Sequence, residues 1–466
     1  MIEVSFEKII ESYHNEIINT TQELIRIRSV GEKGPTDMPF GKGMNDALEY
    51  VLNLAENMGF VVKNLGGYCG YAEYGEGDLY IGIMTHVDTC PEGELWTVPP
   101  FEGRIMNNRI YGRGSMDNKG PLMAALYGIK AVKDSGKKLN KKIRLIIGTD
   151  EERYYKDIEH YLSKEKPPIA GFTLDGQFPV VFAEKGLAMI EFYSDIEQIG
   201  AERIEYIKGG TAENTVPGHC EAYLVTDRKS EIISKLLLFS KENRHNMTAR
   251  ITDDGVVIES FGVETHSMAL EKGINAISPL VSFINYVQYG NKAVRDIIRF
   301  LDDAIGFDLF GKGFNVDCED AFSGKLTLNF GIASLDCKGI TVRFDLRYPV
   351  TCDYEKTSNK IIGKFEENGF TLIENTNWDP VYFPKEHFLI KALLKAYQEV
   401  TKDTSEPISS GSGSYSKVMP NIAAFGAIFP GESEAWHRVN EFIDIDNLIK
   451  LTEIYAAAVY ELSNTL

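Results

Sequence analysis

The chain has 466 residues, of which 43% are hydrophobic and 25% charged, and its formal net charge is −19 with a pI near 5.0. A chain of this length is longer than a single compact hydrophobic core usually accommodates, so two or more domains are expected. The acidic balance argues against nucleic acid and anionic membrane surfaces as partners, because both require a basic footprint on the protein.

Six cysteines are scattered along the chain without a CxxC pair, which is typical neither of a disulfide framework nor of a thiolate zinc site. The N-terminus carries acids from residue 3 and lacks the apolar segment of a signal peptide. No apolar run approaches the ~18 residues that a membrane span needs. We therefore expect a cytoplasmic protein with no membrane partner.

The first part of the chain alternates helical and strand patterns. Apolar residues at three- and four-residue spacings predict a helix over residues 5–28, and a second helix is expected over 45–60. Short apolar runs predict strands at 79–88 and 142–150, and the intervening residues 118–136 indicate a helix. Strands that alternate with helices favour an α/β sheet.

After about residue 185 the pattern changes. The run GITVRFDLRYP alternates, which predicts a sheet buried on one side only, as in an α+β module. Its apolar face holds Ile340, Val342, Phe344 and Leu346, and its polar face holds Thr341, Arg343, Asp345 and Arg347. Helical character returns near residue 385. We infer an α/β domain in two parts, residues 1–185 and 383–466, interrupted by an inserted domain of residues 186–382.

The motif THVD places His86 and Asp88 at the end of a predicted strand. Residues two apart on a strand face the same side, so the carboxylate lies beside the imidazole. A metal ligand and the acid that orients it have this arrangement. A core histidine paired with a neighbouring acid has it too, and the motif alone does not separate the two interpretations.

The segment YGRGSMDNKGP combines glycines with a proline, which indicates a tight loop that enters a helix. Asp117 stands where a dinucleotide fingerprint would have its third glycine, so the segment is not that fingerprint. The loop places Asp117 near a helix N-terminus at the mouth of the sheet. An acid stabilised by the helix dipole is the alternative interpretation.

Three adjacent acids, Asp150, Glu151 and Glu152, follow the second predicted strand. Open α/β sheets bind ligands beyond the carboxyl ends of their strands, so these acids and His86 are expected to converge there. With Asp117 they form a set of nitrogen and oxygen ligands that suits Zn²⁺ or Mn²⁺. Two adjacent acids can also divide labour, one binding metal and the other accepting a proton from water. A solvated turn is the alternative.

Seven motifs in a fixed order give the chain a family resemblance. They are THVD, RGSMDNKGP, GTDEE, LDGQFPVVFAEKG, NTVP, DLRYP and WHRVNE. This order resembles the zinc-dependent peptidase and deacylase family of peptidase V and carnosinase, and within it the bacterial peptidase V-like dipeptidases. The resemblance runs from about residue 20 to the C-terminus. It implies an α/β, zinc-aminopeptidase-like catalytic domain with a central mixed sheet flanked by helices, interrupted by an α+β lid domain.

The resemblance implies two divalent metal ions, with zinc expected and manganese or cobalt as alternatives. Asp117 matches the aspartate that bridges both metals. His86 and Asp175 complete the ligands of one metal, and Glu152 and His437 complete those of the other. Asp175 also matches the branch of the family that acts on dipeptides with a free amino terminus. By itself, the segment around Asp175 is equally typical of an Asp-Gly turn.

Catalytic roles follow from the same matching. Glu151 matches the general base that activates the metal-bridging water, and Asp88 matches the acid that orients His86. In the inserted domain, His266 matches a residue that stabilises the oxyanion, and Asn214 matches a residue near the substrate.

Arg347 matches the arginine that binds the substrate's carboxylate, a role that suits the planar guanidinium. A charge on a solvated strand face is the alternative. The stretch SSGSGSYSKV matches a glycine-rich, substrate-lining segment, with Gly411, Gly413 and Ser414 in contact with the substrate. Lys417 stands where the family has arginine, so it receives no role. A flexible Gly/Ser linker is the alternative for this stretch.

The sequence thus predicts a dinuclear metallodipeptidase, with a small peptide as its binding partner. A metal-dependent deacylase of N-acyl amino acids is the first alternative, and a non-catalytic metal- or amino-acid-binding relative is the second. A large lid favours a monomer and leaves a homodimer open. The physiological metal, the preferred side chains, the acceptance of β-alanyl or D-residues and the role of Asp150 stay open.

Overall fold

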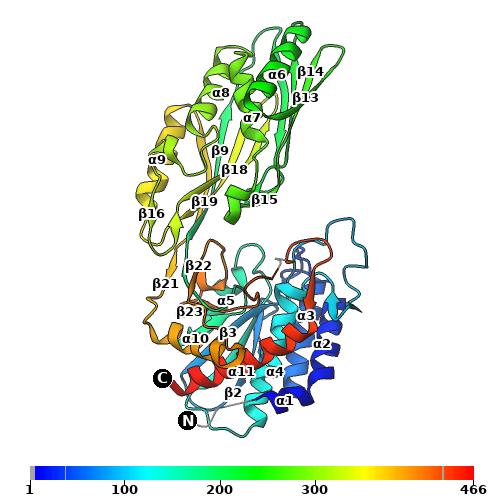
Figure 1. Cartoon of the computed structure of the whole chain (residues 1–466), viewed down its shortest axis with the longest axis vertical. Coiled ribbons are helices and arrows are strands. Elements are labelled where there is room, and N and C mark those ends of the chain that lie inside the picture. The colour runs from blue at the N-terminus through cyan, green and yellow to red at the C-terminus, as the bar shows by residue number, and fades with distance from the viewer. Residues whose placement is uncertain (1–5, 37, 433–434, 466) are drawn as a thin grey trace. The chain divides into compact units, whose positions relative to one another are not determined.

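The computed structural model describes residues 6–36, 38–432 and 435–465. The chain forms two compact units. Figure 1 colours the chain from blue at the N-terminus to red at the C-terminus. The first unit comprises Met1–Ala183 and Val381–Leu466, and the second comprises Glu184–Pro380. Each unit is described by itself below.

The first unit is built on a six-stranded sheet with the order β1-β2-β6-β3-β7-β23. β3 pairs in parallel with β6 and β7, and β7 pairs in parallel with β23, whereas β1 and β2 are antiparallel to their neighbours. The strands are β1 (Val61–Asn64), β2 (Cys69–Tyr74), β3 (Tyr80–His86), β6 (Lys142–Gly148), β7 (Ala170–Thr173) and β23 (Ile422–Ala424). The predicted α/β class with a central mixed sheet is confirmed.

Helices flank this sheet. The helix predicted over residues 5–28 is divided at Tyr13, while the other helices of the first half lie close to their predicted ranges. α4 and α11 pack on each other and on β3 and β6 (Figure 1). The helices are α1 (Glu7–Ser12), α2 (His14–Arg26), α3 (Lys42–Asn57), α4 (Gly120–Asp134), α5 (Lys156–Lys164), α10 (Phe388–Thr401) and α11 (Ile445–Thr465).

Two three-stranded sheets complete the described part of the first unit, with the orders β21-β8-β22 and β24-β5-β4. Their strands are β4 (Arg104–Met106), β5 (Arg109–Tyr111), β8 (Val181–Glu184), β21 (Val381–Tyr382), β22 (Ile408–Ser410) and β24 (Phe442–Asp444). β24 pairs with β5 next to the loop that carries Asp117, so the C-terminal part of the chain reaches the predicted site.

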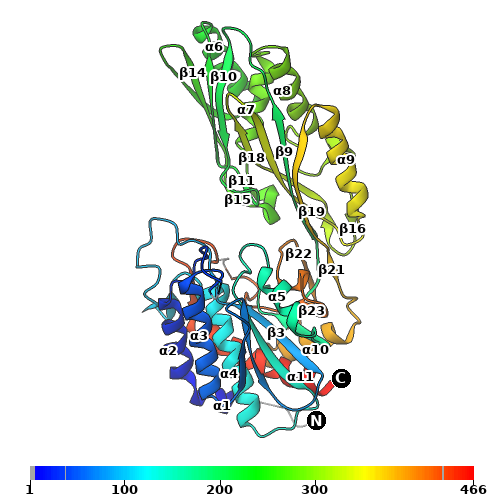
Figure 2. The ribbon, with the colours of Figure 1, turned by 180° about the vertical axis from the view of Figure 1, so that it is seen from behind.

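The second unit is an eight-stranded antiparallel sheet with helices, ordered β13-β14-β12-β10-β18-β19-β9-β20 (Figure 2). Its strands are β9 (Gly186–Asp195), β10 (Arg203–Gly209), β12 (His219–Val225), β13 (Asn246–Ile251), β14 (Gly255–Phe261), β18 (Thr327–Leu335), β19 (Gly339–Tyr348) and β20 (Thr371–Trp378). Short pairs are formed by β11 (Thr215–Val216) with β15 (Thr265–His266), and by β16 (Glu319–Asp320) with β17 (Gly324–Lys325).

The helices of this unit are α6 (Lys229–Asn243), α7 (Ile277–Tyr286), α8 (Lys292–Ala304) and α9 (Tyr354–Glu367). They share one hydrophobic core with the inward side chains of the sheet. The predicted alternation of β19 is confirmed on its apolar face, where Ile340 and Val342 are buried. On the polar face Thr341 and Arg343 are half-buried, but Asp345 and Arg347 are buried. The prediction of one buried side therefore fails at that end of the strand.

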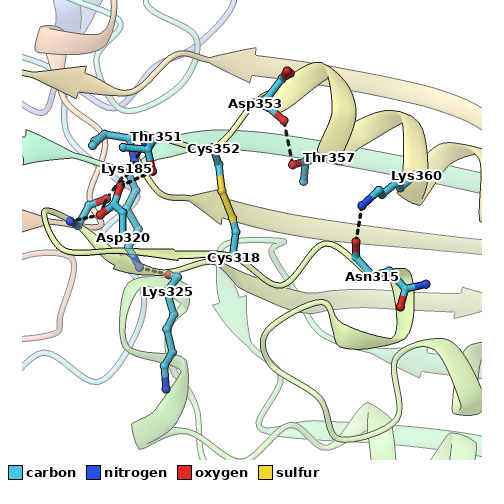
Figure 3. The surroundings of a disulfide bond; sticks show 12 residues. Lys185, Asn315, Cys318, Asp320, Lys325, Thr351, Cys352, Asp353, Thr357 and Lys360 are labelled. Atoms are coloured by element: carbon cyan, nitrogen blue, oxygen red, sulfur yellow. Dashed lines mark hydrogen bonds between the residues drawn. A yellow bond between two sulfur atoms is a disulfide. The ribbon is translucent and has the colours of Figure 1, made fainter.

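A disulfide joins Cys318 to Cys352 in the second unit. Figure 3 shows it beside Asp320, whose carboxylate accepts hydrogen bonds of 3.1 Å from the main-chain N–H and the hydroxyl of Thr351. The disulfide therefore fastens the β16–β17 hairpin to the turn that follows β19. The cysteine spacing in the sequence did not predict this pair. Among the described residues, no helix is long and apolar enough to cross a membrane.

Candidate active site

The carboxyl ends of the parallel strands carry most of the predicted metal ligands. His86 is the last residue of β3, Glu151 and Glu152 follow β6, and Asp175 follows β7. Because β3 is parallel to both β6 and β7, these ends meet at one edge of the sheet. The predicted convergence at the strand ends is confirmed.

His86 lies at the centre of this edge and is fully buried. Its Nε2 is 3.1 Å from Oδ1 of Asp117, and its Nδ1 is 3.1 Å from the main-chain oxygen of Asp88 and 3.3 Å from Oδ1 of the same residue. Burial lowers the pKa of His86, but its contacts with Asp117 and Asp88 outweigh burial and raise the pKa well above its ordinary value. The imidazole is thus fixed between two carboxylates.

His437 reaches Asp117 from the C-terminal part of the chain and also contacts Glu152. Its Nε2 is 3.0 Å from Oδ2 of Asp117 and 3.0 Å from Oε2 of Glu152. Asp117 therefore lies between the two histidines, each of which contacts a different oxygen of its carboxylate. Burial raises the pKa of Asp117, but hydrogen bonds with His437 and His86 outweigh it and lower the pKa below its usual range.

Glu151 and Asp175 form a second group with His86. One donor atom from each of the three residues lies within 4.8 Å of the other two. Glu151 is 9% exposed, and its Oε1 has no hydrogen-bond partner among the described residues. Burial and the charge of Asp175 raise the pKa of Glu151 well above its ordinary value, and burial raises that of Asp175 to about 7. Both carboxyl groups are therefore buried beside other carboxylates.

Asp150, the remaining acid of the cluster, stabilises the turn that follows β6. Asp150 accepts a 3.1 Å hydrogen bond from the main-chain N–H of Lys156 and pairs with Arg153 over 3.2 Å. Asp88 holds the same turn from the other side, because its Oδ2 accepts the N–H of Glu152 at 2.9 Å. The solvated-turn alternative is wrong, since Asp150 is 1% exposed.

A buried glutamate that the sequence did not single out supports the loop of Asp117. Glu441 accepts hydrogen bonds at one oxygen from the main-chain N–H groups of Met116 and Asp117, and at the other from Gly114 and Arg113. These four bonds are 2.8–3.1 Å long. Glu441 belongs to the motif WHRVNE, but an acid in a polar segment gives no local sign of this role.

The Gly/Ser stretch 409–418 is folded, so the flexible-linker alternative is wrong. Tyr415 is fully buried, its hydroxyl donates to Asp157 over 2.5 Å, and its ring packs edge-on against His86. Ser414 is buried and caps the short turn that follows it, whereas Gly411 and Gly413 are half-buried. Gly148 admits this packing, because a Cβ there would lie 1.8 Å from the hydroxyl of Tyr415.

The three predicted residues of the second unit lie together within that unit. The main-chain oxygen of Asn214 accepts the N–H of Ser267, the residue after His266, over 2.8 Å. Ser267 donates its hydroxyl to Asp345 over 2.9 Å, and Arg347 binds both oxygens of Asp345 at 2.8–2.9 Å. Arg347 is 3% exposed, so the solvated-face alternative is wrong.

Sequence comparisons with known proteins give matches over most of the chain. The model of "Peptidase family M20/M25/M40" matches residues 82–461. The "Putative dipeptidase YtjP" of Bacillus subtilis (strain 168) is 36% identical over 457 residues, which cover 96% of this chain and 97% of that protein.

Solved structures show the same fold at low identity. A dipeptidase of Saccharomyces cerevisiae, Dug1p, superposes with a TM-score of 0.61 at 14% identity and covers 98% of both chains. Human carnosine dipeptidase 1 superposes with a TM-score of 0.58 at 14% identity, again over 98% of both chains.

Proposed function

The chain belongs to peptidase family M20/M25/M40, and from this premise we propose that it is a dinuclear metallodipeptidase acting on dipeptides with a free amino terminus. The observation that carries the proposal is the meeting of two histidines and four carboxylates from separate segments of the first unit. The name of the 36% identical relative, a dipeptidase, supports the choice of substrate class.

The donor atoms fit a pair of divalent cations. Imidazole nitrogens and carboxylate oxygens suit zinc or manganese, and the buried Oε1 of Glu151, which lies beside these donors, has no hydrogen-bond partner among the described residues. One ion would be held by His86, Asp117 and Asp175, and the other by Asp117, Glu152 and His437, with zinc expected in both places. When bound, the ions supply Lewis-acid polarisation of the scissile carbonyl and favour ionisation of the attacking water.

Glu151 is the proposed general base. It is buried at the strand ends, it has an oxygen without a partner in the described structure, and it adjoins His86 and Asp175. A carboxylate in this position takes the proton of the attacking water and returns it to the leaving amine. Asp88 is the proposed positioning residue for His86, because its contacts at Nδ1 direct Nε2 toward Asp117.

Substrate contacts are proposed for residues of both units. In the second unit, His266 would stabilise the developing oxyanion, Asn214 would lie near the substrate, and Arg347 would bind its carboxylate. The connection of these residues through Ser267 and Asp345 supports a shared role. In the first unit, Gly411, Gly413 and Ser414 would line the substrate, which the packing of Tyr415 against His86 supports.

The decisive experiment compares substrate classes on the metal-loaded protein. We expect Ala-Ala and similar dipeptides to be hydrolysed with added Zn²⁺, Mn²⁺ or Co²⁺, and N-acetyl and N-succinyl amino acids to be left intact. Hydrolysis of the acyl substrates alone would replace this proposal by a deacylase. Hydrolysis of neither class with any of the three metals would favour a non-catalytic binding protein.

A further inference from the structure

A cysteine lies among the proposed ligands of the second metal. Cys90 follows His86 by four residues, and its Sγ is 3.1 Å from Oε2 of Glu152. The same oxygen is 3.0 Å from Nε2 of His437. The donor atoms of Cys90, Glu152 and His437 all lie within 4.8 Å of one another, a separation that one ion between them can span.

We propose that Cys90 is a sulfur ligand of the metal ion held by Glu152, His437 and Asp117, so that this position has mixed nitrogen, oxygen and sulfur donors. The inference rests on the proposed function, because it presupposes the metal pair. The thiol releases its proton to solvent when the ion binds. The other position, around His86 and Asp175, keeps nitrogen and oxygen donors only.

The local structure favours ligation over a hydrogen bond from the thiol alone. The main-chain N–H of Cys90 also binds Glu152, at Oε1 over 3.2 Å, and therefore fixes the cysteine next to that carboxylate. Neighbouring Glu151 is 9% exposed and has an oxygen without a partner in the described structure, an independent sign that this edge of the sheet is built for cations. Among the described residues, Cys90 is the one cysteine in the two groups whose donor atoms are close enough to hold an ion.

Sulfur changes which metals the position prefers. Thiolate is a soft ligand that favours zinc and cobalt over manganese and magnesium, whereas carboxylates and imidazole accept all of these. The two positions should therefore differ, with the Cys90 position selective for zinc and the His86 position more permissive. Loading with manganese alone should leave the Cys90 position weakly filled.

The test is cobalt spectroscopy on metal-free full-length protein. Titration with two equivalents of Co²⁺ should produce a near-ultraviolet sulfur-to-cobalt charge-transfer band in the wild type. Cys90→Ser should lose the band and bind one of its two zinc ions more weakly by at least about tenfold, because loss of even an outer partner of a metal ligand costs about 10–100-fold in affinity. The control is Cys337→Ser, which removes an exposed thiol and should keep the band.

A second measurement needs no variant. X-ray absorption of the zinc-loaded wild type should show a sulfur neighbour at about 2.3 Å. Two bound ions and dipeptide hydrolysis without a sulfur signal would overturn the role of Cys90 and leave the proposed function standing. A band that persists in Cys90→Ser would also overturn it. Failure to bind metal at all would overturn both.

Discussion

The main-chain N–H of Asp117 donates to Oε1 of Glu441 over 3.1 Å, which ties the proposed bridging ligand to the motif that supplies His437. The other oxygen of Glu441 accepts from Gly114 and Arg113. One carboxylate thus binds the loop of Asp117 to the segment of His437, and it joins two parts of the proposed metal site that are distant in sequence.

We expect Glu441→Gln to weaken metal binding by about 10–100-fold. Each oxygen of Glu441 accepts from two N–H donors, so the amide NH₂ of glutamine would face two donors whichever way the amide is turned. Each donor left without an acceptor costs about 1–3 kcal/mol. Calorimetric titration of metal-free protein with Zn²⁺ measures the effect. Asp444→Asn is the control, because Asp444 pairs with Arg109 at a half-buried position on the same segment. Unchanged affinity in Glu441→Gln would show that the loop holds its shape without the carboxylate.

Glu151→Gln should retain two metal ions and lose about 10²–10⁴-fold in kcat on dipeptides, which is the contribution of general base catalysis. Elemental analysis and steady-state kinetics check both parts. Glu152→Gln is the matched variant, since the adjacent residue is a proposed ligand and its loss should reduce metal content. An active Glu151→Gln enzyme would refute the assignment of the base.

Arg347→Lys should reduce the preference for a dipeptide over its C-terminal amide. Hydrogen bonds to charged groups contribute about 1.5–3 kcal/mol, so the wild-type preference is expected to be about 10–150-fold. The measurement is the ratio of kcat/KM for the two substrates in each enzyme. If kcat/KM falls by the same factor for the dipeptide and for its amide, Arg347 acts only by holding Asp345, whose side chain is fully buried.

Glu453→Gln should stabilise the protein at alkaline pH. Burial on α11, with Glu7 nearby, raises the pKa of Glu453 above its ordinary value of 4.5. Glu453 therefore binds its proton more tightly in the folded protein than in the unfolded chain. The protonated carboxyl contributes its full share to the free energy of unfolding below about pH 4.5, and this contribution is lost as pH rises through the folded pKa. The variant should match wild type at pH 4.5 and exceed it at pH 8.

Urea unfolding with a chelator present measures this difference. Glu461→Gln is the control on the same helix, because Glu461 pairs with Lys395 over 2.8 Å and its loss should give no gain at pH 8. A difference that is independent of pH would assign the effect to packing and not to the proton on Glu453.

The strands and the convergence of their ends were predictable, because β3 and β6 are mostly apolar segments followed by polar residues. The break at Tyr13 was not, since no glycine or proline marks it. The burial of Asp345 and Arg347 was also missed, because their alternation indicated a solvent face and Ser267 from a distant segment covers it. The contacts of Glu441 and Cys90 were not predicted for the same reason, because their partners lie far away in sequence. The roles assigned to the site residues stay predictions.

The parallel pairing of β7 with β23 has a consequence for biosynthesis. β7 ends at Thr173, and its partner strand begins only at Ile422, after the whole second unit. A ribosome adding about 5–20 residues per second needs about 12–50 s for the roughly 250 residues in between. Throughout that interval the nascent chain presents an unpaired strand edge, which is a hazard for aggregation, and it still lacks His437. The proposed metal centre would therefore be among the last features to be completed, and the interruption gives the second unit time to fold first.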